Sequence, residues 1–154
     1  MDISLRPLTR ENLWPVVDIK LHPEQEGHVE VNVASIANAY VEPTFVPLVI
    51  YAGEEPVGFC MYGQHPVTGG WWVIRLMIDR DHQGKGYGRT AMEQVIEMMI
   101  DRTGCEEIIT SFVPANAVAS SLYTSLGFRP TGEWEDGEPL VALSVAEWRA
   151  TRKR

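Results

Sequence analysis

The segment from residue 71 to residue 100 constrains the fold of this chain most strongly. It opens with eight large, mostly apolar residues, WWVIRLMI, a length and composition typical of a buried strand. A short polar turn and the glycine-rich run QGKGYGR (83–89) follow, and apolar residues then recur at helical spacing as far as Ile100. The pattern predicts a strand, a glycine loop and a helix that begins near Gly84 with few side chains around its first turn.

The start of a helix in such a loop is a favourable binding site for an anion. The first backbone N–H groups of a helix have no intrahelical partner, and the macrodipole places about half a positive charge there. Glycines allow a phosphate to approach this bare backbone, so the sequence indicates a phosphate or pyrophosphate ligand. A glycine-rich turn without any ligand is the alternative, although each glycine in a helix costs up to about 1 kcal/mol.

Two common nucleotide-binding loops do not match this run. The Rossmann fingerprint G-x-G-x-x-G needs a third glycine where this chain has Arg89, and a P-loop needs Ser or Thr where it has Gly86. The pattern Q-x-x-G-x-G at 83–88 instead resembles the pyrophosphate-binding loop of the GNAT superfamily of acyl-CoA-dependent N-acetyltransferases. The resemblance implies acetyl-CoA as the acetyl donor, held by Gln83, Gly84, Lys85, Gly86, Tyr87, Gly88 and Arg89.

A second segment, PANAVASSLYTSLGF at 114–128, has an apolar stripe, Asn116 as a natural N-cap and Gly127 as a natural helix stop. Asn116 and Tyr123 are seven residues apart, about two helical turns, and so lie near one face. The pattern N-A-x-x-x-x-L-Y-x-x-x-G-F is similar to the late helix of the same superfamily. That resemblance implies that Asn116 contacts the cofactor and that the Tyr123 hydroxyl points at the thioester sulfur. From the residues alone, Tyr123 could equally be a core aromatic.

The reaction that the resemblance implies is attack of an amine on the thioester of acetyl-CoA. The strand edge at Leu76, Met77 and Ile78 would bind the pantetheine arm like an added strand, and the Met77 N–H would serve as oxyanion donor. Tyr123 would donate a proton to the departing thiolate. An alkylammonium of pKa about 10.4 is uncharged in only about one part in 2,500 at pH 7, so a base must help.

The polar connection at 22–32 supplies candidates for that base. It carries Glu24, Glu26 and Glu30, of which we choose Glu30, while Glu55 is a weaker candidate and ordinary solvated carboxylates are the alternative. This connection and the following SIANA (35–39) look similar to bacterial spermine/spermidine acetyltransferases, in which the first two helices line the acceptor pocket. The resemblance implies that a polycationic acceptor is bound by Glu24, Gln25, Glu26 and Glu30.

Composition and charge narrow the possible functions. At 154 residues and 45% hydrophobic, the chain is expected to form one domain, 1–154, with its own core. A net charge of −8 disfavours nucleic acid and favours a cationic small molecule, although it also simply promotes solubility. The scattered histidines lack metal-ligand spacing, so no metal is expected. The lack of a signal-peptide pattern and of a long apolar run predicts a cytoplasmic protein without a membrane partner.

The expected elements alternate in a way that predicts an α/β (α+β) domain. The GNAT fold implied by the motifs is a mixed, mostly antiparallel central sheet of about seven strands flanked by about four helices. Pro15 is expected to break or kink the first helix, which Thr9 would cap, and the basic tail 149–154 is expected to be solvated. The expected strands are 3–7, 45–52, 57–64, 71–78, 107–113, 128–133 and 140–145, and the expected helices are 10–21, 34–40, 84–102 and 116–126.

Other functions remain open at this point. The acceptor could be another amine, such as an aminoglycoside, an amino acid or a protein N-terminus. The chain could also be a non-catalytic acyl-CoA-binding sensor, although Tyr123 argues against this because a binder needs no acid at the sulfur. A nucleotide-binding regulatory domain lacks the hydroxyl that would hold magnesium. The resemblance also implies a homodimer as one option for the assembly.

Overall fold

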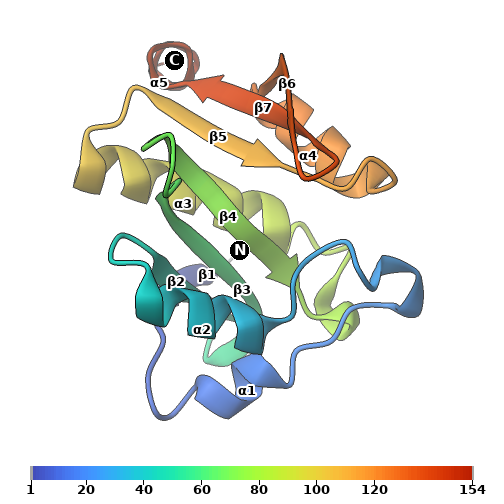
Figure 1. Cartoon of the computed structure of the whole chain (residues 1–154). Coiled ribbons are helices and arrows are strands. Elements are labelled where there is room, and N and C mark those ends of the chain that lie inside the picture. The colour runs from blue at the N-terminus through green and yellow to red at the C-terminus, as the bar shows by residue number, and fades with distance from the viewer. Residues whose placement is uncertain (1, 154) are drawn as a thin grey trace.

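The computed structural model describes residues 2–153 and contains a seven-stranded sheet in the order β1-β2-β3-β4-β5-β7-β6 (Figure 1). Neighbouring strands are antiparallel except β4 and β5, which are parallel. The expected mixed, mostly antiparallel sheet is therefore confirmed. The strands are β1 (Ile3–Pro7), β2 (Val46–Ala52), β3 (Glu55–Gln64), β4 (Trp71–Ile78), β5 (Glu107–Ser111), β6 (Arg129–Glu135) and β7 (Glu138–Ser144).

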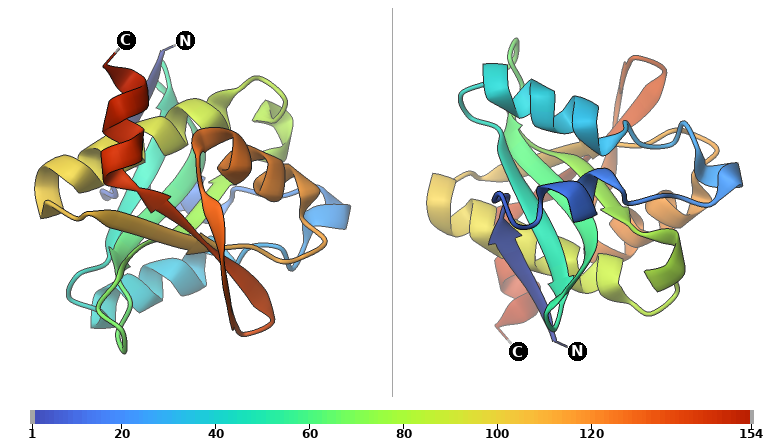
Figure 2. Two further views of the ribbon diagram at one scale, coloured as in Figure 1. Left: turned by 90° about the horizontal axis from the view of Figure 1, so that it is seen from above. Right: turned by 90° about the horizontal axis from the view of Figure 1, so that it is seen from below.

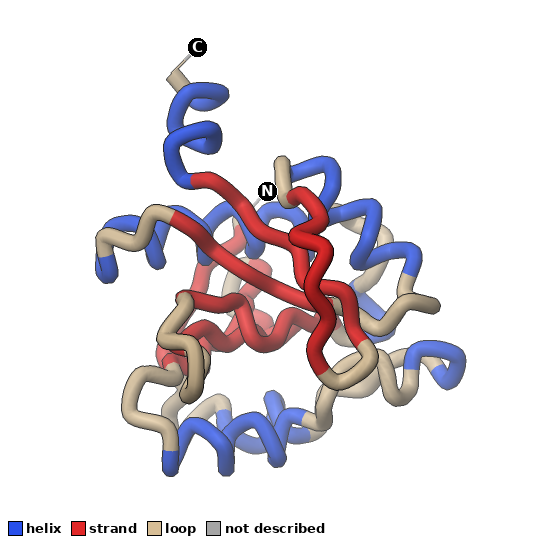
Figure 3. The backbone as a smooth tube through the Cα atoms, turned by 45° about the horizontal axis from the view of Figure 1, so that its top comes forward, coloured by secondary structure: helices blue, strands red, loops and turns tan. Residues whose placement is uncertain are grey.

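Helices cover both faces of this sheet (Figures 2 and 3). Alternate residues of a strand point to opposite faces, and on β3 Cys60 packs into the larger core cluster while Phe59 packs into the smaller one. The smaller cluster lies under α1 (Leu13–Val17) and α2 (Asn32–Val41). The larger cluster lies under α3 (Tyr87–Thr103), α4 (Ala117–Leu126) and α5 (Val145–Arg152). Two short 3₁₀ turns, η1 (Pro23–Gln25) and η2 (Arg80–His82), lie in the connections.

The first helix is shorter than expected, and Thr9 is not its cap. Asn12 is the N-cap residue; its Oδ1 accepts from the Thr9 N–H (2.7 Å) and its Nδ2 donates to the carbonyl of Pro7 (3.0 Å). Pro15 lies in the first turn, where a missing N–H costs no helical hydrogen bond. Beyond the helix, the Lys20 N–H donates to Oδ1 of Asp79 (3.1 Å), so the chain is held by the end of β4 instead of continuing as a helix.

The last helix was missed. The segment after β7 forms α5, in which Ser144 is the N-cap and accepts from the Glu147 N–H (3.3 Å). Val145 and Trp148 are buried, and the Trp148 indole donates to Oε1 of Glu97 on α3 (2.7 Å). The basic residues Arg149, Arg152 and Lys153 are exposed, as expected for a solvated tail, while the buried residues of α5 precede them.

A seam divides the sheet between β4 and β5. The two strands share a single registered pair, Trp72 with Ile109, whereas the other neighbours pair along most of their length. The register of β4 against β3 also shifts here, since Tyr62 pairs with Val73 and Met61 pairs with Arg75. Ile74 is thus an extra residue, a bulge that bends β4 away from β5. The ligand cavities of the molecule open along this seam.

Candidate active site

Two cavities meet along the seam. A cavity of about 400 Å³, the cofactor-side cavity, lies between the end of β4, the 83–89 loop and α4. A cavity of about 540 Å³, the acceptor-side cavity, lies between α2, β4, β5 and the β6–β7 hairpin. Six residues line both cavities, and we call this set the junction: His28, Val29, Leu76, Asn116, Ala119 and Tyr123.

The cofactor-side cavity gathers nearly all the residues expected to bind acetyl-CoA. Lys85 is the exception: it is exposed and its ammonium lies 6.0 Å from the centre of the Tyr87 ring. The expected residues that line the cavity are Leu76, Met77, Ile78, Gln83, Gly84, Gly86, Tyr87, Gly88, Arg89, Asn116 and Tyr123. Segments that are adjacent in sequence, β4 and the loop that follows it, therefore supply most of this wall.

The glycine loop presents backbone to this cavity, although the helix begins later than expected. Gly84 and Gly86 have φ values of +77° and +82°, in the left-handed region, so α3 begins at Tyr87 and not near Gly84. The N–H of Thr90 makes the helical bond to the carbonyl of Gly86 (3.2 Å). The N–H groups at 87–89 precede this bond and have no intrahelical acceptor, so they can donate to a pyrophosphate.

The backbone N–H groups of β4 point alternately toward β3 and toward the seam, and this alternation decides which of them are free. The Asp79 N–H donates to the carbonyl of Val57 (2.8 Å), so the pair Met77–Phe59, two residues earlier, is also bonded toward β3. A Cβ on Gly58 would lie 2.5 Å from the Met77 carbonyl, which agrees with that direction. The Met77 N–H therefore points toward β3 and does not fit the oxyanion role expected for it, whereas the N–H groups of Leu76 and Ile78 face the seam. Of these two residues, Leu76 belongs to the junction.

Tyr123 is held at the junction by packing and by one hydrogen bond. Its ring contacts those of Phe128 and Phe112, with centroids 5.6 and 6.1 Å away, and the residue is 6% exposed. Burial raises the pKa of Tyr123 to about 12, against the effect of a hydrogen bond with Thr110 that lowers it. The phenol is therefore protonated throughout the neutral pH range and acts there as a donor.

Asn116 reaches the junction from the start of α4. Its Oδ1 accepts from the Ala119 N–H (3.1 Å), so the expected N-cap is confirmed in the structure. Gly127, at φ +105°, ends the same helix as expected. Because the cap occupies the Asn116 carbonyl oxygen, the Nδ2 group is the part of the side chain that can donate to a ligand.

The acceptor-side cavity is rich in carboxylates. Glu30 and Glu42 lie on the side of α2, and the β6–β7 hairpin supplies the opposite wall. The carboxylates of this cavity are Glu30, Glu42, Glu135, Asp136 and Glu138, and its guanidinium is that of Arg75. Carboxylates thus exceed guanidinium groups by four, which favours a cationic ligand.

Two of the hairpin carboxylates are fixed by neighbours. His65 Nδ1 accepts from the backbone N–H groups of Val67 and Thr68, so Nε2 carries the proton and donates to Oε1 of Glu135 at 2.6 Å. Glu138 accepts from the Ser111 hydroxyl at 3.0 Å. The hairpin residues and Glu42 were not predicted, because no local pattern shows which loops lie opposite the glycine loop.

Arg75 is another residue of this cavity that was not predicted. Its Nε donates to the hydroxyl of Ser35 on α2 (3.1 Å), and its Nη1 donates to the carbonyl of Ile74 (2.8 Å). Burial lowers the pKa of Arg75, while the nearby carboxylates of Glu30 and Glu138 raise it. The signal was available: a single Arg interrupts the otherwise apolar strand WWVIRLMI.

The residues expected to bind the acceptor lie in different parts of the structure. Glu30 lines the acceptor-side cavity, whereas Glu24 and Glu26 are exposed and are not among the described residues that line either cavity. Gln25 lines the cofactor-side cavity instead. Glu55 Oε1 lies 3.3 Å from Nε2 of His82, and Glu55 is also outside both linings in the described part of the chain.

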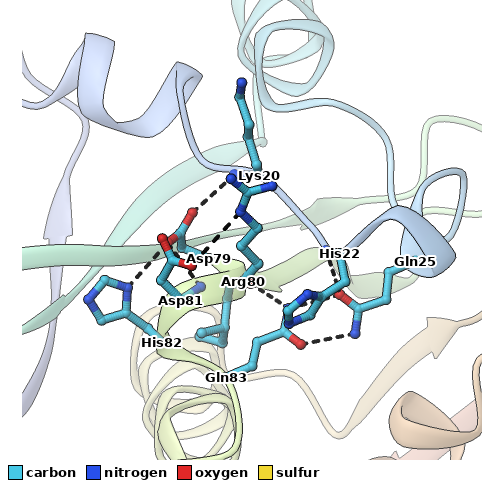
Figure 4. Close-up of polar contacts among 9 residues, drawn as sticks. Lys20, His22, Gln25, Asp79, Arg80, Asp81, His82 and Gln83 are labelled. Carbon is cyan, nitrogen blue, oxygen red and sulfur yellow. Dashed lines mark hydrogen bonds and ion pairs between the residues drawn. The ribbon is translucent and has the colours of Figure 1, made fainter.

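Gln25 joins the acceptor connection to the cofactor loop (Figure 4). The side-chain amides of Gln25 and Gln83 donate to each other, both at 2.9 Å, and Gln83 also donates to the carbonyl of Ile78 (2.9 Å). Nearby, burial acts to raise the pKa of Asp79, but hydrogen bonds from the Lys20 N–H and from His82 lower it overall. The segment from Lys20 to Gln25 is therefore attached to the end of β4 at two points, through Asp79 and through Gln83.

Within residues 2–153 no group of three or more His, Cys, Asp or Glu side chains is arranged to hold a metal ion. In the same range, no helix combines the length and apolarity needed to cross a membrane. The described cysteines, Cys60 and Cys105, are free thiols, and burial raises the pKa of Cys60 to about 12. Cys60 is thus a core residue and not a nucleophile.

Comparisons with known proteins identify the family and the fold. The spermine/spermidine N(1)-acetyltransferase of Bacillus subtilis (strain 168) is 28% identical over 152 residues, covering 94% of this chain and 100% of the relative. Two solved structures share the fold. Spermidine N-acetyltransferase from Vibrio cholerae in complex with CoA and spermine has a TM-score of 0.76, 16% identity and coverage of 96% and 98%. AAC(6')-Ib in complex with ribostamycin and coenzyme A has a TM-score of 0.78, 18% identity and coverage of 99% and 98%. The family model described as Acetyltransferase (GNAT) family matches residues 13–128, and the chain belongs to that family.

Proposed function

We propose that this N-acetyltransferase uses acetyl-CoA to acetylate a primary amine of a polyamine. One observation carries the proposal: a cavity with four excess carboxylates meets the cofactor-side cavity at Tyr123. A linear polyamine carries two or more positive charges. Carboxylates can therefore hold a distal ammonium while the proximal amine reaches the junction. The spermine/spermidine activity named for the B. subtilis relative, which is similar over 94% of this chain, supports the same acceptor class.

On the cofactor side, the chain supplies backbone donors. The N–H groups at the start of α3 would bind the pyrophosphate, and the seam-facing edge of β4 would bind the amide-rich pantetheine arm. The Leu76 N–H would donate to the acetyl carbonyl oxygen, where negative charge develops during attack. Acetyl-CoA would thereby be held with its thioester at the junction.

Tyr123 would stabilise the departing thiolate. With a pKa of about 12 the phenol is a weaker acid than an ordinary tyrosine, so it holds its proton until charge develops on the sulfur. Such help by a positioned acid contributes about 10²–10⁴-fold to a rate. A non-catalytic acyl-CoA sensor would have no need for this group at the junction.

The two cavity walls would hold the acceptor. Glu30 and Glu42 on one side and the hairpin carboxylates on the other leave room for an extended cation between them. Exposed ion pairs contribute only about 0.2–1 kcal/mol each, so selectivity would come from several carboxylates acting together. We further propose that the chain works as one domain without a metal in the cytoplasm, where free thiols such as Cys60 and Cys105 stay reduced.

The test is thiol release from acetyl-CoA with a panel of amines. Spermidine and spermine should exceed n-butylamine more than tenfold in kcat/KM, and the gap should shrink at high salt because charges are screened. Faster acetylation of ribostamycin or of a peptide N-terminus than of any polyamine would overturn the acceptor assignment. Binding of acetyl-CoA without turnover of any amine would instead identify a sensor.

A further inference from the structure

The proposed reaction needs a proton acceptor close to the attacking nitrogen. The thioester carbon would lie between the Leu76 N–H and the Tyr123 hydroxyl, so the amine must attack at the junction. Glu30, the base expected from the sequence, lines the acceptor-side cavity but not the cofactor-side cavity. Its carboxylate also accepts a hydrogen bond from the adjacent Val31 N–H (3.2 Å). Glu30 is therefore placed to attract the acceptor and not to reach the point of attack.

Among the six junction residues, His28 is the one whose side chain can accept the proton. Val29, Leu76 and Ala119 are apolar. The Asn116 oxygen is occupied by the N-cap bond, and Tyr123 is a protonated phenol. Imidazole is the side chain used most often as a general base.

His28 is held in place through the residues that precede it. Its backbone N–H donates to the carbonyl of Gln25 (3.0 Å), across a turn in which Gly27 has φ +86°. Gln25 is in turn bonded to Gln83 of the cofactor loop. The backbone of His28 is thus connected, through a turn with two intervening residues and the Gln25–Gln83 amide pair, to the loop that would hold the pyrophosphate.

The imidazole itself is unusual in its surroundings. Its Nδ1 is buried and makes no hydrogen bond within residues 2–153. Buried polar atoms are paired in the great majority of cases, whereas in the described chain no protein group competes for this ring. Because Nδ1 has almost no exposed surface, Nε2 is the ring nitrogen that can exchange a proton with an amine in the cavity.

We propose that His28 is the general base for the attacking amine, an inference that rests on the proposed function. The ammonium of the acceptor gives one proton to the imidazole, which releases it to solvent, and the nitrogen forms a bond to the acetyl carbon. The carbon–sulfur bond breaks with its electron pair on sulfur. The second proton lost by the nitrogen replaces the one that Tyr123 gives to the sulfur. The products are the acetylated amine, the free thiol and one proton in solution.

The test is the variant His28→Phe, which keeps a planar ring without a lone pair. Turnover of spermidine should fall at least 100-fold, within the range for loss of a general base. The dissociation constant of acetyl-CoA, measured by calorimetry, should stay within about twofold because the loop contacts remain. His22→Phe is the matched control, since it makes the same change in the same connection outside both cavity linings of the described chain. It should leave turnover unchanged.

A pair of diamines separates catalysis from a structural effect. The amines of 2,2-difluoro-1,3-diaminopropane are less basic than those of 1,3-diaminopropane, so more of them arrive uncharged. The loss in His28→Phe should be at least tenfold smaller with the fluorinated diamine. Equal losses with both diamines, or native turnover in His28→Phe, would overturn the assignment. A loss of kcat in Glu30→Gln that matches or exceeds that of His28→Phe would transfer the role to Glu30. If the native protein acetylates no amine, it is the proposed function that fails.

Discussion

The two cavities that meet at the seam are built in different ways. The larger part of the lining of the cofactor-side cavity comes from one continuous stretch, the end of β4, the 83–89 loop and the start of α3. The acceptor-side cavity is lined by segments far apart in sequence, including the 27–30 connection, α2, β5 and the β6–β7 hairpin. A ligand common to a whole family can be held by backbone, whereas a variable ligand needs side chains that can change independently.

The largest loss of activity is expected from a substitution at the junction, where the two cavities meet. Tyr123→Phe removes one hydroxyl and keeps the ring, so the contacts with Phe112 and Phe128 should persist. The kcat for spermidine should drop about 10²–10³-fold while acetyl-CoA affinity changes little. Tyr62→Phe is the control, because Tyr62 is buried in the same core cluster but is outside both cavity linings of the described residues. Nearly full turnover in Tyr123→Phe would assign this residue to the core alone.

A smaller effect, confined to the cofactor side, is expected from Gly86→Val. A branched side chain at φ +82° would strain the loop and occupy the approach of a phosphate to the backbone. Acetyl-CoA affinity, measured by calorimetry, should fall more than tenfold. Gly104→Val applies the same strain at the other end of α3, where φ is +66°, and should lower stability without changing affinity. Equal affinities of folded Gly86→Val and native protein would contradict the backbone mode of binding.

The smallest effect is expected on the acceptor side, where no single carboxylate dominates. Glu42→Gln with Asp136→Asn removes two charges that face this cavity and should raise the KM for spermidine about threefold to tenfold, since each exposed pair contributes about 0.2–1 kcal/mol. The kcat and the acetyl-CoA affinity should stay near native values.

A second double variant, which removes the same number of charges elsewhere, tests whether the location of the carboxylates matters. Glu24→Gln with Glu26→Gln changes the net charge by the same amount in exposed residues outside both linings of the described chain. It should change the KM for spermidine less than twofold. Similar KM values for the two double variants would mean that overall charge, and not the cavity, attracts the acceptor.

The same contrast explains what could be predicted from the sequence. The glycine loop, Asn116 and Tyr123 were predicted because each lies in a short local pattern. Strands and most helices were predicted for the same reason, through their spacing of apolar residues. The contribution of the β6–β7 hairpin was not predicted, because it depends on which loops the sheet order places opposite each other.

Two differences from the sequence expectations, the choice of Met77 and the missing last helix, have more local causes. Met77 was chosen over Leu76, although its N–H points toward β3. The side to which each N–H points depends on which residues of β4 form hydrogen-bonded pairs with β3, and the bulge at Ile74 shifts that register. The helix α5 was missed because Val145 and Trp148 are its buried anchors, too few to show a helical period next to a run of basic residues. Both depend on tertiary packing that a local pattern does not contain.

The alternation of β4 has a consequence for isotope exchange. The amides of Met77 and Asp79 face β3, and that of Asp79 is bonded to Val57, so both should exchange slowly with deuterium. The amides of Leu76 and Ile78 face the seam, beyond the one registered pair with β5, and should exchange faster. Acetyl-CoA should then slow Leu76 and Ile78 selectively, so that the end of this one strand divides into two populations of amides, one that holds the sheet and one that holds the ligand.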